Sequence, residues 1–100
     1  MNYLTLGFRV FEVQERAEAY HLVPFHTAKQ AAYGDDMKAG DLDFDPLNAA
    51  HRAQLVRVDA APTIIRKDPA HRKQDAEAFI ASLEQDERTR AESQLREWLR

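Results

Sequence analysis

The chain has 100 residues, a formal net charge of −3 and no cysteine. A chain of this length forms one domain, and the missing cysteines exclude disulfide bonds, thiolate catalysis and the common structural zinc sites. No apolar stretch is as long as a transmembrane helix, and the first residues lack the basic and then apolar pattern of a secretory signal. The sequence therefore predicts one soluble, cytoplasmic domain over residues 1–100.

Two strands are predicted in the N-terminal quarter. Apolar residues occupy every second position over most of the stretch from 3 to 13, which is the period of a strand with one buried face. A polar break at 14–16 separates it from a second apolar stretch at 17–25. The pair predicts an antiparallel hairpin, although no Asn-Gly or Asp-Gly turn marks it.

Short elements are predicted in the middle of the chain. Thr27 and Gln30 have the spacing of a capping box and predict a helix over residues 28–33. The Asp-Pro step at Asp45 is a helix-start signal and predicts a helix over residues 46–54. Two apolar runs then indicate short strands, at residues 55–58 and 63–66.

The C-terminal segment, residues 69–100, contains no glycine and is rich in residues that favour helix. Its apolar side chains form one helical stripe that is interrupted between Glu84 and Arg90. This pattern predicts either one long helix or a helical hairpin broken near residues 86–89. A single helix would be about 45 Å long and would project from the domain, whereas a hairpin would fold back on the sheet.

These elements together predict the α+β class. We expect a small, mainly antiparallel sheet of three or four strands, with short helices and a long C-terminal helix or helical hairpin.

An acidic segment precedes a basic one. Residues 35–45 contain five aspartates, and Asp41, Asp43 and Asp45 alternate with Leu42 and Phe44. A calcium loop with this start needs a glycine at its sixth position and a glutamate at its twelfth, where this chain has a proline and an arginine. The segment is therefore interpreted either as an edge strand protected by charge or as a row of carboxylates that faces a basic partner.

The basic segment lies between residues 51 and 73. Binding of phosphates would need its cations on one surface, and no aromatic residue is present there to stack on a base. Nucleic-acid binding is kept as the alternative function, with these candidate residues: Arg52, Arg57, Arg66, Lys67, Arg72 and Lys73.

No catalytic pattern is found. The four histidines match no metal-binding spacing, and with three glycines the chain lacks a phosphate-binding loop. Only Ser82 and Ser93 are available as hydroxyl nucleophiles of the serine type, and neither lies in a nucleophile elbow. We therefore expect no enzyme activity, no metal and no cofactor.

The leading hypothesis is a non-enzymatic protein-binding module. Such a module would be a small regulator or inhibitor of a larger protein or nucleoprotein assembly, of the kind that phages and bacterial mobile elements encode. Large aromatic residues dominate binding energy at interfaces, so Trp98 is the expected anchor, and a homodimer through the C-terminal helix is a further expectation. The candidate partner-binding residues are Asp41, Asp43, Asp45, Leu95 and Trp98.

Overall fold

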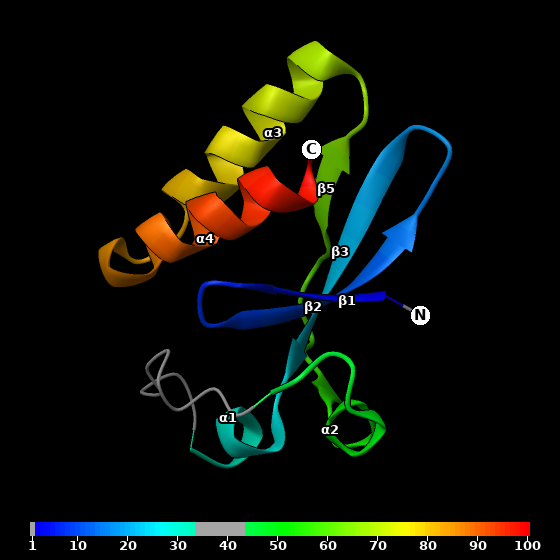
Figure 1. The fold of residues 1–100 in the computed structure, drawn as a ribbon, viewed down its shortest axis with the longest axis vertical. Helices are drawn as coiled ribbons and strands as arrows, with labels where there is room; N and C mark the ends of the chain where they lie inside the picture. Colours follow the sequence, from blue (N-terminus) through cyan, green and yellow to red (C-terminus); the bar gives the residue numbers. More distant parts are fainter. Residues whose placement is uncertain (1, 34–43) are drawn as a thin grey trace.

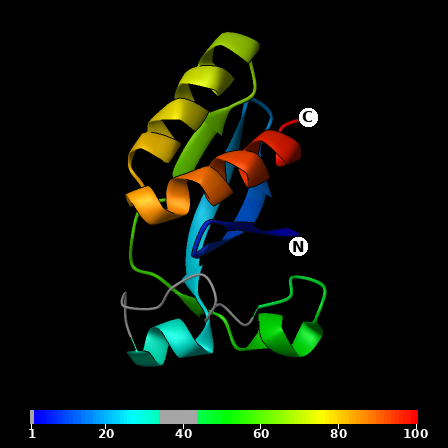
Figure 2. The same ribbon diagram turned by 60° about the vertical axis from the view of Figure 1, so that its left-hand side comes forward.

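The computed structural model describes residues 2–33 and 44–100, and it is α+β as predicted. An antiparallel sheet is packed on one face by two helices, while two shorter helices lie at one end of the sheet (Figure 1) (Figure 2). In chain order the elements are β1 (Asn2–Leu6), β2 (Arg9–Glu15), β3 (Ala19–His26), α1 (Ala28–Tyr33), α2 (Ala49–Ala53), β4 (Val56–Arg57), β5 (Thr63–Arg66), α3 (Pro69–Ala81) and α4 (Gln85–Trp98).

The prediction of one strand over residues 3–13 is wrong, because a tight turn at Gly7 and Phe8 divides this stretch into β1 and β2. Gly7 has a φ of 63°, which a residue with a side chain rarely adopts. The two strands pair from Leu6 opposite Arg9 outward, so apolar alternation continues on both sides of the turn. The predicted pairing with the next strand is confirmed, since β2 and β3 are antiparallel neighbours.

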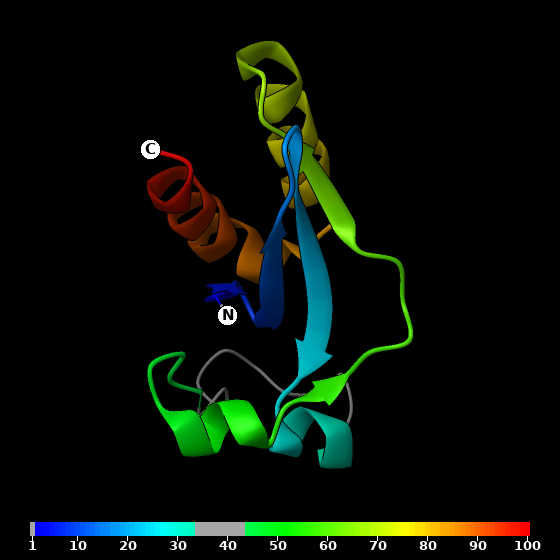
Figure 3. The ribbon, with the colours of Figure 1, turned by 90° about the vertical axis from the view of Figure 1, so that its right-hand side faces the viewer.

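The far edge of the sheet is a broken strand. Both β4 and β5 pair with β3, at its two ends, and the chain between them bows away from the sheet (Figure 3). The break faces Pro24: the Val58 N–H donates to the Pro24 carbonyl over 3.1 Å, but Pro24 has no N–H to donate in return. The ladder therefore loses a bond where the edge strand leaves it.

The C-terminal segment is a helical hairpin, so it does not project as a single helix. Its break falls at residues 82–84, and the predicted position at 86–89 is wrong because those residues lie inside α4. Two side chains bind carbonyls at the end of α3 and in the turn after it: Ser82 Oγ donates to the Phe79 carbonyl over 2.6 Å, and Arg88 donates to the carbonyls of Leu83 and Ala81. The break lets Leu83 turn into the core, where it is 2% exposed.

One hydrophobic core lies between the sheet and this hairpin. Its members come from four strands, both helices and the turn between them, and their burial is the main stabilisation of the fold. They are Leu6, Phe11, Leu22, Ile65, Phe79, Leu83, Ala91 and Leu95.

The two short helices start at polar caps. The capping box of α1 is confirmed in both directions, because Gln30 N–H donates to Thr27 Oγ1 and Thr27 N–H donates to Gln30 Oε1. In contrast, α2 starts at Ala49 and not at residue 46. Asn48 is its cap, and its Oδ1 accepts from the backbone N–H groups of Ala50 and His51. Asp45 Oδ1 closes a separate turn before the helix by accepting from the Leu47 N–H. No helix in residues 2–33 and 44–100 has the length and apolar character required to cross a bilayer.

Candidate binding cleft

A cleft of about 600 Å³ opens beside the corner between α3 and α4. Its walls are the β1–β2 turn, the C-terminal half of β3, the loop between β4 and β5, α1 and the helical corner itself. The half-buried apolar residues of the lining are Phe8, Pro24, Phe25 and Val58, and the polar part comes from Arg9, His26, Gln30, Ser82, Glu84, Asp86 and Glu87.

The best-defined polar group in this cleft is the carboxylate of Glu87. The residue is 2% exposed, yet it lies in the first turn of α4 between the buried Leu83 and Ala91. Its Oε2 accepts from the Phe8 N–H over 3.0 Å, and its Oε1 accepts from Arg9 Nε and Nη2, each over 3.3 Å. A buried carboxylate needs such compensation, and here charge and hydrogen bonds are both supplied. Arg9 remains half exposed on the cleft side.

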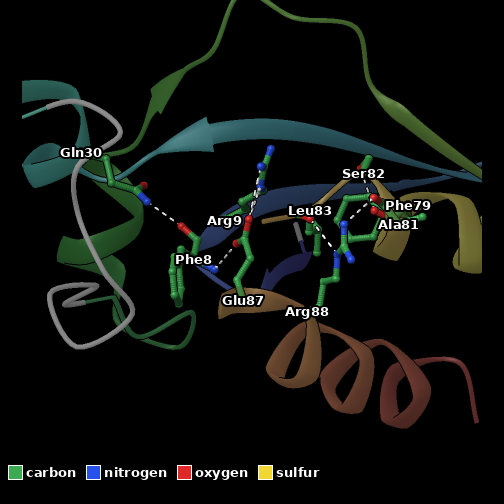
Figure 4. A network of polar contacts seen from close by, with 9 residues as sticks. All are labelled: Phe8, Arg9, Gln30, Phe79, Ala81, Ser82, Leu83, Glu87 and Arg88. Atoms are coloured by element: carbon green, nitrogen blue, oxygen red, sulfur yellow. Dashed lines mark hydrogen bonds and ion pairs between the residues drawn. The ribbon is translucent and has the colours of Figure 1, made fainter. Parts of the chain in front are cut away.

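The β1–β2 turn is held in place by side chains from two helices. Gln94 Oε1 on α4 accepts from the Gly7 N–H over 2.7 Å, and Gln30 Nε2 on α1 donates to the Phe8 carbonyl over 2.6 Å. Figure 4 shows the Arg9–Glu87 pair lying between Gln30 on one side and Ser82 with Phe79 on the other. The polar wall of the cleft is therefore tied to α1, the turn and α4 together.

Negative charge accumulates at the rim. Glu84 and Asp86 are exposed, line the cleft, and form no ion pair with any described residue. The positive charge of Arg9 balances the negative charge of Glu87, so Glu84 and Asp86 give the cleft a net negative charge. Arg88 fixes the corner that carries them through its bonds to Leu83 and Ala81.

The predicted partner-binding residues do not meet in this cleft. Asp41 and Asp43 lie outside the described residues, and Asp45 is exposed near the start of α2. Leu95 was expected on a binding surface, but it is 2% exposed in the core and offers no contact area. Trp98 is partly buried, with its ring 4.9 Å from that of Tyr20 in an edge-on arrangement. The stripe that looked free in the sequence is covered by this chain's own sheet.

The candidate nucleic-acid residues are spread over the molecule. Arg57 on β4 and Arg66 on β5 pair with opposite ends of β3. Arg66 is bound to both oxygens of Asp75, and Lys67 Nζ lies 3.2 Å from Glu15 and 5.0 Å above the Tyr20 ring. Arg52 donates to the Pro46 carbonyl, while Arg72 and Lys73 lie on the first half of α3. Because Arg66 and Lys67 are already paired with carboxylates, part of the positive charge that would bind phosphates is neutralised within the chain.

Sequence reasoning missed the cleft, although one signal pointed to it. Leu83, Glu87, Ala91 and Leu95 follow one another at intervals of four, so they share one face of a helix. A single glutamate within an apolar face indicates a buried, partnered carboxylate. Its partner Arg9 stands 78 residues away, and no local pattern links the two.

No protein family, no curated protein and no solved structure matches this chain. The molecule's own geometry is therefore the ground for a functional proposal.

Proposed function

We propose that this protein is a non-enzymatic protein-binding module, a small regulator or inhibitor of a partner, and that the cleft is where the partner binds. The observation that supports this most is the combination of an apolar floor with a charged rim in an open cleft. Protein interfaces have this anatomy, with an apolar centre and a polar surround.

Surface next to the cleft favours a protein over a small molecule. Val56 on β4 is 49% exposed and pairs with His26, which lines the cleft. Directly opposed residues in antiparallel strands place their side chains on the same face, so Val56 adds an exposed apolar side chain at the sheet edge beside the cleft wall. A polypeptide segment is long enough to cover both the cleft and Val56.

Capture experiments with a blocked cleft test this proposal. Ala60 is exposed in the cleft wall, and Ala60→Trp would fill the space without removing a core side chain. Tagged wild-type protein should retain a discrete protein from native-host lysate, and Ala60→Trp should lose it.

The matched control is Ala70→Trp, which adds the same side chain to an exposed position in the first turn of α3. It should retain the partner. Equal capture by both variants, or no discrete partner at all, would contradict a protein-binding role for the cleft. Circular dichroism on each variant establishes that the fold is kept.

A further inference from the structure

The charge on the cleft restricts the chemistry of what it binds. The charges of Arg9 and Glu87 cancel in their ion pair, while Glu84 and Asp86 form no ion pair with a described residue. Both carboxylates lie at the start of α4 and line the same cleft. An anionic ligand, including a nucleic-acid phosphate, would be repelled here, whereas a cation would be attracted.

The apolar floor of the cleft restricts the chemistry of its ligand further. Phe8, Phe25 and Val58 line the cleft and are half-buried, so each leaves apolar surface open to a ligand. Pro24 lines the cleft on β3, directly opposite Phe11 in the sheet. A bare metal ion or a small amine would leave this apolar surface uncovered. A long side chain with an apolar stem and a cationic head would cover it and reach the rim at once, as arginine and lysine do.

We infer that the cleft binds a partner segment in which an arginine or lysine stands close to a large apolar residue. The cationic head lies at Glu84 and Asp86, the stem packs on Pro24 and Val58, and the apolar neighbour covers Val56 at the sheet edge. This inference rests on the proposed protein-binding function and adds the chemistry of the partner.

Synthetic peptides provide the test. Three fluorescein-labelled peptides of equal length are used: one alternating arginine with leucine, one alternating glutamate with leucine, and one alternating arginine with serine. Fluorescence anisotropy with the full chain should show binding of the first, markedly weaker binding of the third and none of the second. Affinity for the first should fall as salt is raised, because exposed charges are screened.

Charge-neutral variants locate the contact. Glu84→Gln combined with Asp86→Asn should raise the dissociation constant of the arginine–leucine peptide about tenfold, since each exposed ion pair contributes modestly. The control pair Glu77→Gln with Glu97→Gln changes the net charge equally at exposed positions away from the cleft, and it should leave the dissociation constant within about twofold.

Three results would overturn the inference: equal binding of the glutamate–leucine peptide, equal effects of the two variant pairs, or no binding of the arginine–leucine peptide. The proposed function is judged separately by capture. If a native partner is lost on Ala60→Trp but retained by Glu84→Gln with Asp86→Asn, the cleft binds a protein by other chemistry and only this inference fails.

Discussion

Glu87 shows how one residue can join distant parts of a small fold. It stands where the apolar face of α4 would place a leucine, and its carboxylate reaches the backbone of Phe8 and the guanidinium of Arg9. An apolar residue there would leave the Phe8 N–H without its acceptor, which costs about 1–3 kcal/mol for a buried donor. The charge therefore fixes the turn against the helix and, with it, one wall of the cleft.

Gly7 is the complementary constraint on that turn. A Cβ at this position would lie 2.7 Å from Glu87 Oε2, and the φ of 63° disfavours any side chain. We expect Gly7→Ala to lower the free energy of unfolding by about 2–3 kcal/mol, combining the left-handed backbone cost with the close contact. Urea denaturation measures it.

The two parts of that cost can be separated. In a Glu87→Ala background the contact with Oε2 is gone, while the backbone cost and the 3.1 Å approach to the Cβ of residue 87 remain. Gly7→Ala should therefore be less destabilising in that background, and an identical cost in both would show that the contact with the Glu87 carboxylate is not a source of the effect.

Asp75 makes stability depend on pH in the acid range. Its oxygens accept from Arg66 N–H, Nε and Nη2, and these bonds lower the pKa of the carboxyl from 3.8 to about 2. Because the folded-state pKa is below the unfolded one, the contribution is complete above the unfolded pKa and is lost as pH falls through about 2.

We expect Asp75→Asn to be modestly less stable than the wild type at neutral pH, since the Arg66 side chain is 48% exposed and solvent screens the pair. The difference should shrink below the ordinary carboxyl pKa and vanish near the lowered one. Denaturation series at several pH values measure it. A gap that stayed constant down to the most acidic point would contradict the assigned ion pair.

At the scale of elements, α1 is a local helix with one distant connection. Thr27 Oγ1 accepts from Gln30 N–H, and Gln30 in turn binds Thr27 N–H and the Phe8 carbonyl. Thr27→Ala should cost about 1 kcal/mol, the usual loss for an N-cap. Gln30→Ala should cost more, about 1–2 kcal/mol, because it removes bonds to both partners.

Lys29 is the control for this pair, since it is exposed in the same helix. Lys29→Ala should change the free energy of unfolding by less than about 0.5 kcal/mol. Equal costs for Gln30→Ala and Lys29→Ala would show that the link to Phe8 does not contribute to stability.

Elements whose ends are set by neighbouring residues could be predicted from the sequence, whereas those that depend on distant residues could not. Caps are local, so the start of α1 at Thr27 could be predicted, and it is confirmed by a side-chain bond to the helix backbone. The turn at Gly7 and the break at Ser82 could not, because both depend on residues elsewhere. The Gly7 N–H is bound by Gln94 of α4. The turn at Ser82 places Leu83 in a core whose other members lie largely on strands.

The candidate partner-binding residues show the same difference between local and distant signals. Leu95 and Trp98 were correctly recognised as one apolar face, but the sequence could not show that the sheet of the same chain covers it. The cleft collects residues from position 8 to position 87, so its charge balance arises only on folding. At this scale, local patterns predict which side chains share a face, and topology decides what that face meets.

At the scale of the whole molecule, the fold has a well-packed half and a sparsely packed half. All members of the main core lie between the sheet and the helical hairpin α3–α4. At the other end, α2 has five residues and none of them is buried. It is linked to the sheet through the Phe44 ring, which lies between His51 and Tyr3 at centroid distances of 6.3 and 6.4 Å. The cleft lies between these halves.

This asymmetry predicts the order in which backbone amides open. Short helices without buried contacts open locally, whereas strands in the core exchange only on global unfolding. By native-state hydrogen exchange, we expect opening free energies for α2 to be at least about 2 kcal/mol below those of paired amides in β2 and β3. Added denaturant should lower the values for β2 and β3 steeply and those for α2 only slightly, because little surface is exposed when α2 opens. Equal values and equal denaturant slopes in both regions would mean that the molecule unfolds as one cooperative unit, with α2 held as firmly as the core.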